Sequence, residues 1–107
     1  MSDIDVTEAH RRWTAGELTI IDCREEQEYD ATHVDGMPLI PMSEFLARVD
    51  ELPEDGALAI FCRTGSRSAQ VADYLTATGD YGEVDNVMGG IVAWAAAGLP
   101  YQGDPPR

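Results

Sequence analysis

The chain has 107 residues, 44% hydrophobic and 25% charged, and its formal net charge is −13 because 20 acidic residues face 7 arginines and no lysine. This length predicts one domain with a modest core, and no apolar stretch approaches the roughly 20 residues of a membrane helix. The negative charge argues against nucleic acid and anionic membranes as partners, since both bind basic patches.

The acidic, lysine-free surface predicts adaptation to concentrated salt, where screening weakens the self-repulsion of the folded chain. The alternative is an acidic solubilising surface on an ordinary cytoplasmic protein, and unfolding in dilute and in molar potassium chloride distinguishes the two. Acidic residues in the first ten positions, without the basic start and apolar block of a secretory signal, lead us to expect a cytoplasmic protein.

Apolar, β-rich runs recur along the chain and predict strands. Most lack polar alternation, which is typical of strands covered on both faces of a sheet and therefore of parallel strands. In chain order the predicted strands are residues 4–6, residues 18–22, a short proline-bounded strand around Leu39 and Ile40, residues 57–62 and residues 83–90.

The segments between these runs predict helices. Residues 66–79 are the clearest case, because Val71, Ala72 and Leu75 share one face and Gly79 suits the helix end. The other predicted helices are residues 7–16, residues 43–52 with Ser43 as the N-cap, and residues 90–98.

This alternation of strands and helices predicts an α/β fold with a mainly parallel central sheet of about five strands and helices on both faces. We expect a single domain over residues 1–107, with a core at about 4–101 and a frayed tail at 102–107.

The segment FCRTGSRSA, residues 61–69, predicts a reactive site, because Cys62 ends a strand directly before a helix. Ligands of such folds bind beyond the carboxyl ends of the strands. A tight loop there turns backbone N–H groups and the positive end of the helix dipole toward one spot, which favours an anion and a thiolate. We therefore predict Cys62 as an activated nucleophile. The predicted substrate-binding residues are Arg63 and Arg67 for charge, Thr64, Ser66 and Ser68 for hydroxyl donors, and Gly65 for backbone freedom.

The chain contains two cysteines, Cys23 and Cys62, and neither has the spacing of a zinc site. We expect both to be reduced, and Cys23 to be a packed core side chain, although the sequence leaves a bridge between them open. No metal site is predicted.

Three motifs resemble the rhodanese-like domain family, and in particular its single-domain thiosulfate sulfurtransferases. Residues 21–36 resemble the family's early signature, residues 62–69 its active-site loop, and residues 87–100 its closing segment. The residues that carry the first and third motifs are Asp22, Arg24, Glu28, Tyr29, His33 and Gly36, and Gly89, Gly90, Trp94, Gly98 and Pro100.

The resemblance implies an enzyme that works through a persulfide on Cys62. In this scheme the thiolate takes the outer sulfur of a small anionic donor, thiosulfate or a persulfide, and passes it to cyanide, a thiol or a sulfur-carrier protein. No tightly bound cofactor is expected. Asp22 and Arg24 are expected to support the loop from a neighbouring strand end, most simply as structural ion-pair residues, with Glu28 as the partner of Arg24.

Two other functions stay open at this point. Cysteine-dependent phosphatases and arsenate reductases place an arginine six positions after the cysteine, whereas Arg67 lies five positions after Cys62 and the tighter loop favours a single sulfur. Rhodanese-like domains also act as non-catalytic interaction modules, usually after loss of the cysteine that this chain retains.

Overall fold

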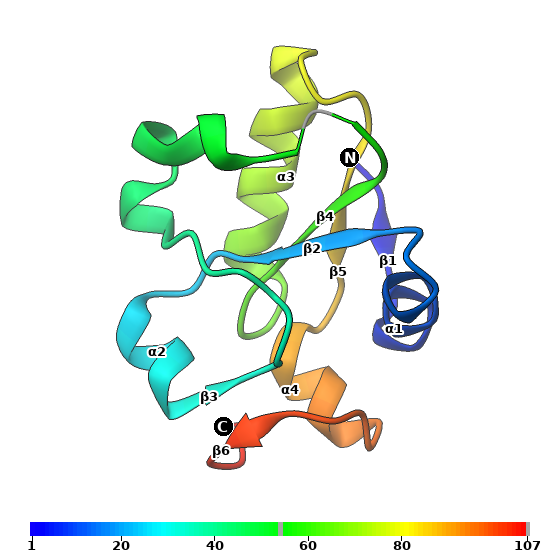
Figure 1. Ribbon diagram of the computed structural model, residues 1–107, viewed down its shortest axis with the longest axis vertical. Helices are drawn as coiled ribbons and strands as arrows, with labels where there is room; N and C mark the ends of the chain where they lie inside the picture. The colour runs from blue at the N-terminus through cyan, green and yellow to red at the C-terminus, as the bar shows by residue number, and fades with distance from the viewer. Residues whose placement is uncertain (54, 107) are drawn as a thin grey trace.

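A computed structural model describes residues 1–53 and 55–106. Figure 1 shows a central sheet with helices packed around it. The elements are β1 (Asp3–Ile4), α1 (Val6–Thr14), β2 (Thr19–Asp22), α2 (Glu26–Ala31), β3 (Thr32–His33), the 3₁₀ helices η1 (Met42–Glu44) and η2 (Leu46–Glu51), β4 (Leu58–Phe61), α3 (Ser66–Thr78), β5 (Val84–Val87), α4 (Gly90–Ala96) and β6 (Gln102–Gly103). Among the described residues, no helix has both the length and the apolar character needed to span a bilayer.

The central sheet has four parallel strands in the order β1-β5-β4-β2. This confirms the α/β fold with a parallel sheet. The short strand expected around Leu39 and Ile40 is reduced to one parallel bridge between Leu39 and Asp22. Pro38 and Pro41 flank it, and beyond Pro41 the Met42 N–H donates to the Cys23 carbonyl at 2.9 Å, so the backbone contact continues without a strand ladder.

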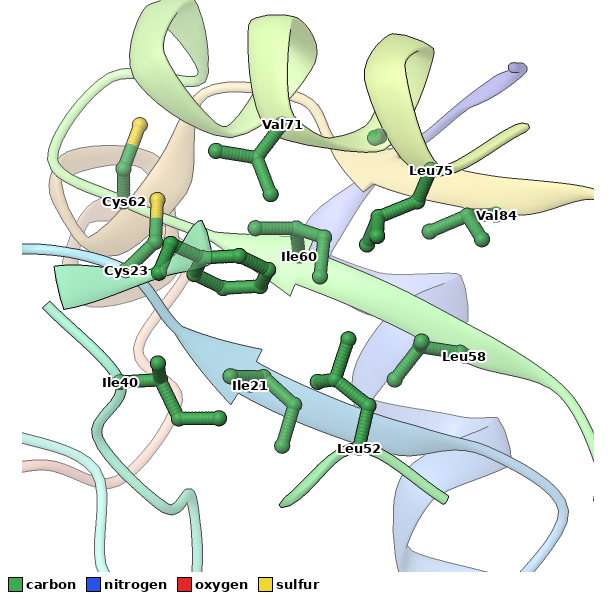
Figure 2. Close-up of a cluster of buried hydrophobic side chains, with 12 residues drawn as sticks. Ile21, Cys23, Ile40, Leu52, Leu58, Ile60, Cys62, Val71, Leu75 and Val84 are labelled. Carbon is green, nitrogen blue, oxygen red and sulfur yellow. The ribbon is translucent and has the colours of Figure 1, made fainter. Parts of the chain in front are cut away.

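Both faces of the sheet are covered, as the unbroken apolar runs predict. Alternation along β4 sends Leu58 and Ile60 toward α3 and the 3₁₀ helices, and Ala59 and Phe61 toward α1 and α4. Figure 2 shows the first of these two cores, in which side chains of α3 lie over those of β2 and β4. The second core is centred on the fully buried Trp94.

The C-terminal segment forms structure that the sequence analysis missed. β6 pairs antiparallel with β3, the Asp104 N–H donates to the Ala31 carbonyl at 2.9 Å, and the Thr32 hydroxyl donates to the Asp104 carbonyl at 2.6 Å. The expectation of a frayed tail is therefore wrong for residues 102–104, and Arg107 lies outside the described residues. The tail is ordered by long-range backbone pairing, which leaves no local signal in its sequence.

The helix expected over residues 43–52 is instead a pair of 3₁₀ helices, and Ser43 does not cap it. The Ser43 hydroxyl donates to the Glu25 carboxylate at 2.6 Å, and its N–H donates to the same carboxylate at 3.1 Å. Ser43 lies inside η1, and the position before this helix is occupied by Pro41. The contact between Ser43 and Glu25 fixes the start of α2, a helix that the sequence analysis did not predict, against η1.

Candidate active site at the end of β4

The loop after β4 wraps around the Cys62 sulfur. Gly65 makes this turn with φ of +95°, and a Cβ at that position would approach the Gly89 nitrogen to 3.0 Å. Glycine adopts such a conformation without steric cost. The chain then enters α3 at Ser66, so the first turn of the helix faces the thiol.

The start of α4 holds the same loop from the other side. The Ile91 N–H donates to the Cys62 carbonyl at 2.9 Å, and the Val92 N–H donates to the Arg63 carbonyl at 3.1 Å. A Cβ on Gly90 would overlap the Cys62 carbonyl oxygen and the Arg63 backbone. The paired glycines of the closing motif therefore let α4 pack directly against the reactive loop.

Three hydrogen-bond donors converge on the Cys62 sulfur. They are the Gly65 N–H at 3.1 Å, the Ser68 N–H at 3.4 Å and the Ser68 hydroxyl at 3.1 Å. Burial alone raises the pKa of the thiol, but the hydrogen bonds from Ser68, Gly65 and the Thr64 backbone outweigh it, so the pKa of Cys62 lies below its ordinary value. The loop therefore favours the thiolate, as the sequence analysis predicts.

The Ser68 hydroxyl connects the thiol to β5 and β1. It also lies 2.5 Å from the Asn86 side-chain oxygen, and the Asn86 amide donates to Asp3 at 2.9 Å. Because the hydroxyl carries one proton, it can donate to the sulfur or to Asn86 but not to both at once. Asn86 was missed by the sequence analysis, since a buried amide within a predicted strand gives no sign of its tertiary partner.

Arg67 follows the loop in the first turn of α3, and its guanidinium is paired with a carboxylate. Its guanidinium makes a bidentate pair with Glu28 at 2.7 and 2.8 Å. The hydrogen bonds from Arg67 lower the pKa of Glu28 to about 2. The pair joins α3 to α2, and it gives Glu28 a partner other than the Arg24 expected from the sequence.

Asp22 and Arg24 pair with each other, which corrects the expected pairing of Arg24 with Glu28. Both are buried, and the Arg24 guanidinium donates to the Asp22 carboxylate at 2.9 and 3.1 Å and to the Thr32 carbonyl at 2.6 Å. Asp22 also accepts the Arg24 backbone N–H at 2.9 Å. The two residues fix the turn after β2, so they support the site at a distance from the sulfur.

The exposed residues of the loop line two hollows. One, of about 750 Å³, lies on the α2 side and includes Arg24, Glu28 and Arg63. The other, of about 340 Å³, includes Thr64, Gly65 and Ser66. Cys62 itself is 1% exposed and lines neither of these hollows. Among the described residues, no group of three or more histidine, cysteine or acidic side chains is placed to hold a metal ion.

Cys23 is a fully buried core residue at the end of β2, as expected. Burial, together with the nearby Cys62 and Asp22, raises the pKa of this thiol well above its usual range. Both cysteines are free thiols, so the bridge that the sequence left open is not formed in this structure.

Known proteins are similar to this chain in sequence and in fold. The chain is 38% identical over 84 residues to a sulfurtransferase of Allochromatium vinosum, covering 78% of each chain. It is 40% identical over 83 residues to a probable adenylyltransferase/sulfurtransferase of Mycobacterium tuberculosis, covering 73% of this chain but 20% of that protein. A rhodanese-related protein from Thermoplasma volcanium superposes with a TM-score of 0.86 at 26% identity, covering 97% of this chain and all of that one. The rhodanese-like domain model matches residues 5–97, and the chain therefore belongs to the rhodanese-like domain family.

Proposed function

We propose that this protein is a sulfurtransferase that carries sulfur as a persulfide on Cys62. The observation that supports this most directly is the convergence of two backbone N–H groups and the Ser68 hydroxyl on one sulfur atom. The two N–H groups are fixed by the backbone, and such donors stabilise a negative charge on sulfur without reorganisation. The similarity to a protein named sulfurtransferase over 78% of the chain points to the same class of reaction.

In the proposed first half-reaction, the Cys62 thiolate attacks the outer sulfur of thiosulfate. A new S–S bond forms on Cys62 while the S–S bond of thiosulfate breaks, and sulfite leaves with the bonding electrons. In the second half-reaction, a thiolate, cyanide or a sulfur-carrier protein attacks the outer sulfur and releases the Cys62 thiolate. Because one cysteine serves both halves, the kinetics are ping-pong.

We assign the approach of the anionic donor to the hollow beside Arg63. Arg63 and Arg24 line this hollow together with Glu28 and Asp104, and Arg63 is the loop residue that brings positive charge to it. Arg63 is exposed at this hollow, whereas Arg24 is buried and Arg67 does not line it. Of the predicted binding residues, we therefore propose Arg63 as the main side-chain contact of the donor, with the loop N–H groups receiving the transferred sulfur.

The phosphatase alternative receives no support from this loop. Six positions after Cys62 stands Ser68, a buried residue whose hydroxyl contacts the thiol, where a phosphatase loop carries its arginine. Arg67 is one position too early and is committed to Glu28. The loop therefore encloses one sulfur atom and lacks the guanidinium that a phosphatase loop carries six positions after its cysteine.

Intact-protein mass spectrometry after brief incubation with thiosulfate tests the proposal. We expect the wild type to gain one sulfur atom and to lose it when cyanide is added, with thiocyanate as the product. Thr14→Ala, which removes an exposed hydroxyl of α1 outside the loop, is the control and should load normally, whereas Cys62→Ser should gain nothing. A wild type that gains no sulfur from thiosulfate, glutathione persulfide or polysulfide, at low or at molar potassium chloride, would refute the persulfide and favour a docking module.

A further inference from the structure

The parallel register places the two cysteines side by side. β2 and β4 pair with Ile21 opposite Ile60 and Asp22 opposite Phe61, and the Cys23 N–H continues the ladder by donating to the Phe61 carbonyl at 2.8 Å. The next position on both strands is therefore the pair Cys23 and Cys62. Neighbouring strands lie about 4.8 Å apart, which falls within the Cα separations that disulfides span.

The two thiols also point to the same side of the sheet. Because side chains alternate along a strand, Cys23 shares the face of Ile21 and Cys62 shares the face of Ile60, and all four belong to the core beneath α3. Figure 2 shows both sulfurs projecting from the strand ends toward the α3 side. The two side chains are 0% and 1% exposed, so a reaction between them needs no access for an outside thiol.

We propose that Cys23 is a resolving thiol that removes the persulfide from Cys62 when no acceptor arrives, a role that rests on the proposed sulfurtransferase function. The Cys23 thiol loses its proton as its sulfur attacks the inner sulfur of the persulfide, which is the Cys62 Sγ. A Cys23–Cys62 disulfide forms, the bond to the outer sulfur breaks, and that sulfur leaves with the electron pair, takes up the proton from Cys23 and is released as hydrosulfide. The sulfane sulfur is reduced and the two cysteines are oxidised, so no other oxidant takes part.

This step makes the enzyme self-limiting. Burial keeps Cys23 protonated, which slows its attack and leaves the persulfide time to meet an acceptor. A persulfide that meets none is converted into hydrosulfide and a chain whose nucleophile is blocked. Reduction by a dithiol, which takes up the oxidation as its own disulfide, returns both cysteines to the free state.

The test tracks the fate of the sulfur in reduced full-length protein loaded with thiosulfate in the absence of acceptor. Intact mass after alkylation reports each state of the chain, and a sulfide electrode reports hydrosulfide. In the wild type we expect the added sulfur to disappear while a species two hydrogens lighter than the reduced chain appears, with one hydrosulfide released per chain. In Cys23→Ser and Cys23→Ala the added sulfur should persist at least about tenfold longer.

Two controls distinguish the reactivity of the Cys23 thiol from the effect of disturbing the core around it. Ile21→Val removes a methylene one pleat away in the same core and should lose its sulfur at the wild-type rate. Treating the reduced wild type with diamide, a two-electron thiol oxidant, tests the pairing without any sulfur donor. We expect a peptide linked through Cys23 and Cys62 after proteolysis under non-reducing conditions.

The outcomes distinguish the two proposals. The resolving role is overturned if the wild type loads sulfur but forms the disulfide neither after loading nor with diamide. It is also overturned if the Cys23 variants lose sulfur as fast as the wild type. In both cases the sulfurtransferase proposal stands. If diamide forms the disulfide but no donor loads sulfur, the sulfurtransferase proposal fails, and the release of hydrosulfide fails with it.

Discussion

Two neighbouring strands of this protein end in the same dipeptide, Cys23-Arg24 after β2 and Cys62-Arg63 after β4, yet the two ends differ in chemistry. At the first end the sulfur is buried in apolar surroundings, and the pKa of Cys23 is raised. At the second end, amides and a hydroxyl donate to the sulfur, and the pKa of Cys62 is lowered.

The turn after each dipeptide accounts for this difference. After Cys62 the loop turns at Gly65 and brings Gly65 and Ser68 N–H groups back onto the sulfur. After Cys23 the chain instead folds Arg24 back onto Asp22, and burial of the Cys23 thiol outweighs its backbone hydrogen bond. The adjoining turn therefore decides whether a cysteine at the end of a parallel strand receives hydrogen bonds that lower its pKa.

The largest expected effect is that of Cys62→Ser. This variant tests whether Cys23 can replace Cys62 as the nucleophile. Because burial raises the pKa of the Cys23 thiol, we expect sulfurtransferase activity to fall by about three orders of magnitude or more. The rate of thiocyanate formation from thiosulfate and cyanide measures this. Residual activity that disappears in the double variant with Cys23→Ala would show that the two strand ends are less different than we argue.

The next effect is that of Asp22→Asn, which disturbs the first strand end. The substitution leaves the buried Arg24 guanidinium without its carboxylate, and removing one member of a buried ion pair costs about 3–5 kcal/mol. Urea unfolding at neutral pH measures the loss. Glu8→Gln, which breaks an exposed pair with Arg11, serves as the control and should change stability little. A similar small change for both variants would contradict the structural role of Asp22.

A smaller effect is expected from Ser68→Ala, which weakens the second strand end. Loss of the hydroxyl donor should raise the pKa of Cys62, lower the thiolate fraction at neutral pH and slow alkylation several-fold. The pH dependence of the iodoacetamide reaction, monitored by mass, measures the shift. Ser66→Ala should leave the midpoint unchanged, and an equal midpoint in Ser68→Ala would mean that the N–H groups alone activate the thiol.

The smallest effect is expected from Glu28→Gln, which loosens the contact between α2 and α3 next to both cysteines. The pKa of Glu28 is about 2 in the folded chain against 4.5 for the ordinary group, so its contribution to stability is full above about pH 4.5 and is lost as the pH falls toward 2. The pair is about one-third exposed, so screening limits that contribution to less than about 1 kcal/mol.

Urea unfolding at pH 7 and at pH 3 measures this prediction. The wild type should be slightly more stable than Glu28→Gln at pH 7, and the difference should shrink at pH 3. A difference that is independent of pH would assign the effect to packing instead of to the charge of Glu28.

Local patterns in the sequence were sufficient to predict the parts of the molecule that depend on near neighbours. Unbroken apolar runs predict a parallel sheet covered on both faces, and the turn around Gly65 predicts an activated Cys62, because strand burial, turns and helix starts are encoded within a few residues. The family signatures lie in the same local segments.

Contacts between distant segments were decided only by the tertiary structure. The ion pairs are one example, since Arg24 pairs with Asp22 while Glu28 pairs with Arg67. The contact of Ser68 with Asn86 and the pairing of β6 with β3 are two more, and local spacing predicts none of these partners. The adjacency of Cys23 and Cys62, 39 positions apart in the sequence, arises in the same way. Strand register is set by packing across the whole sheet, so it places these two thiols side by side although no motif contains both.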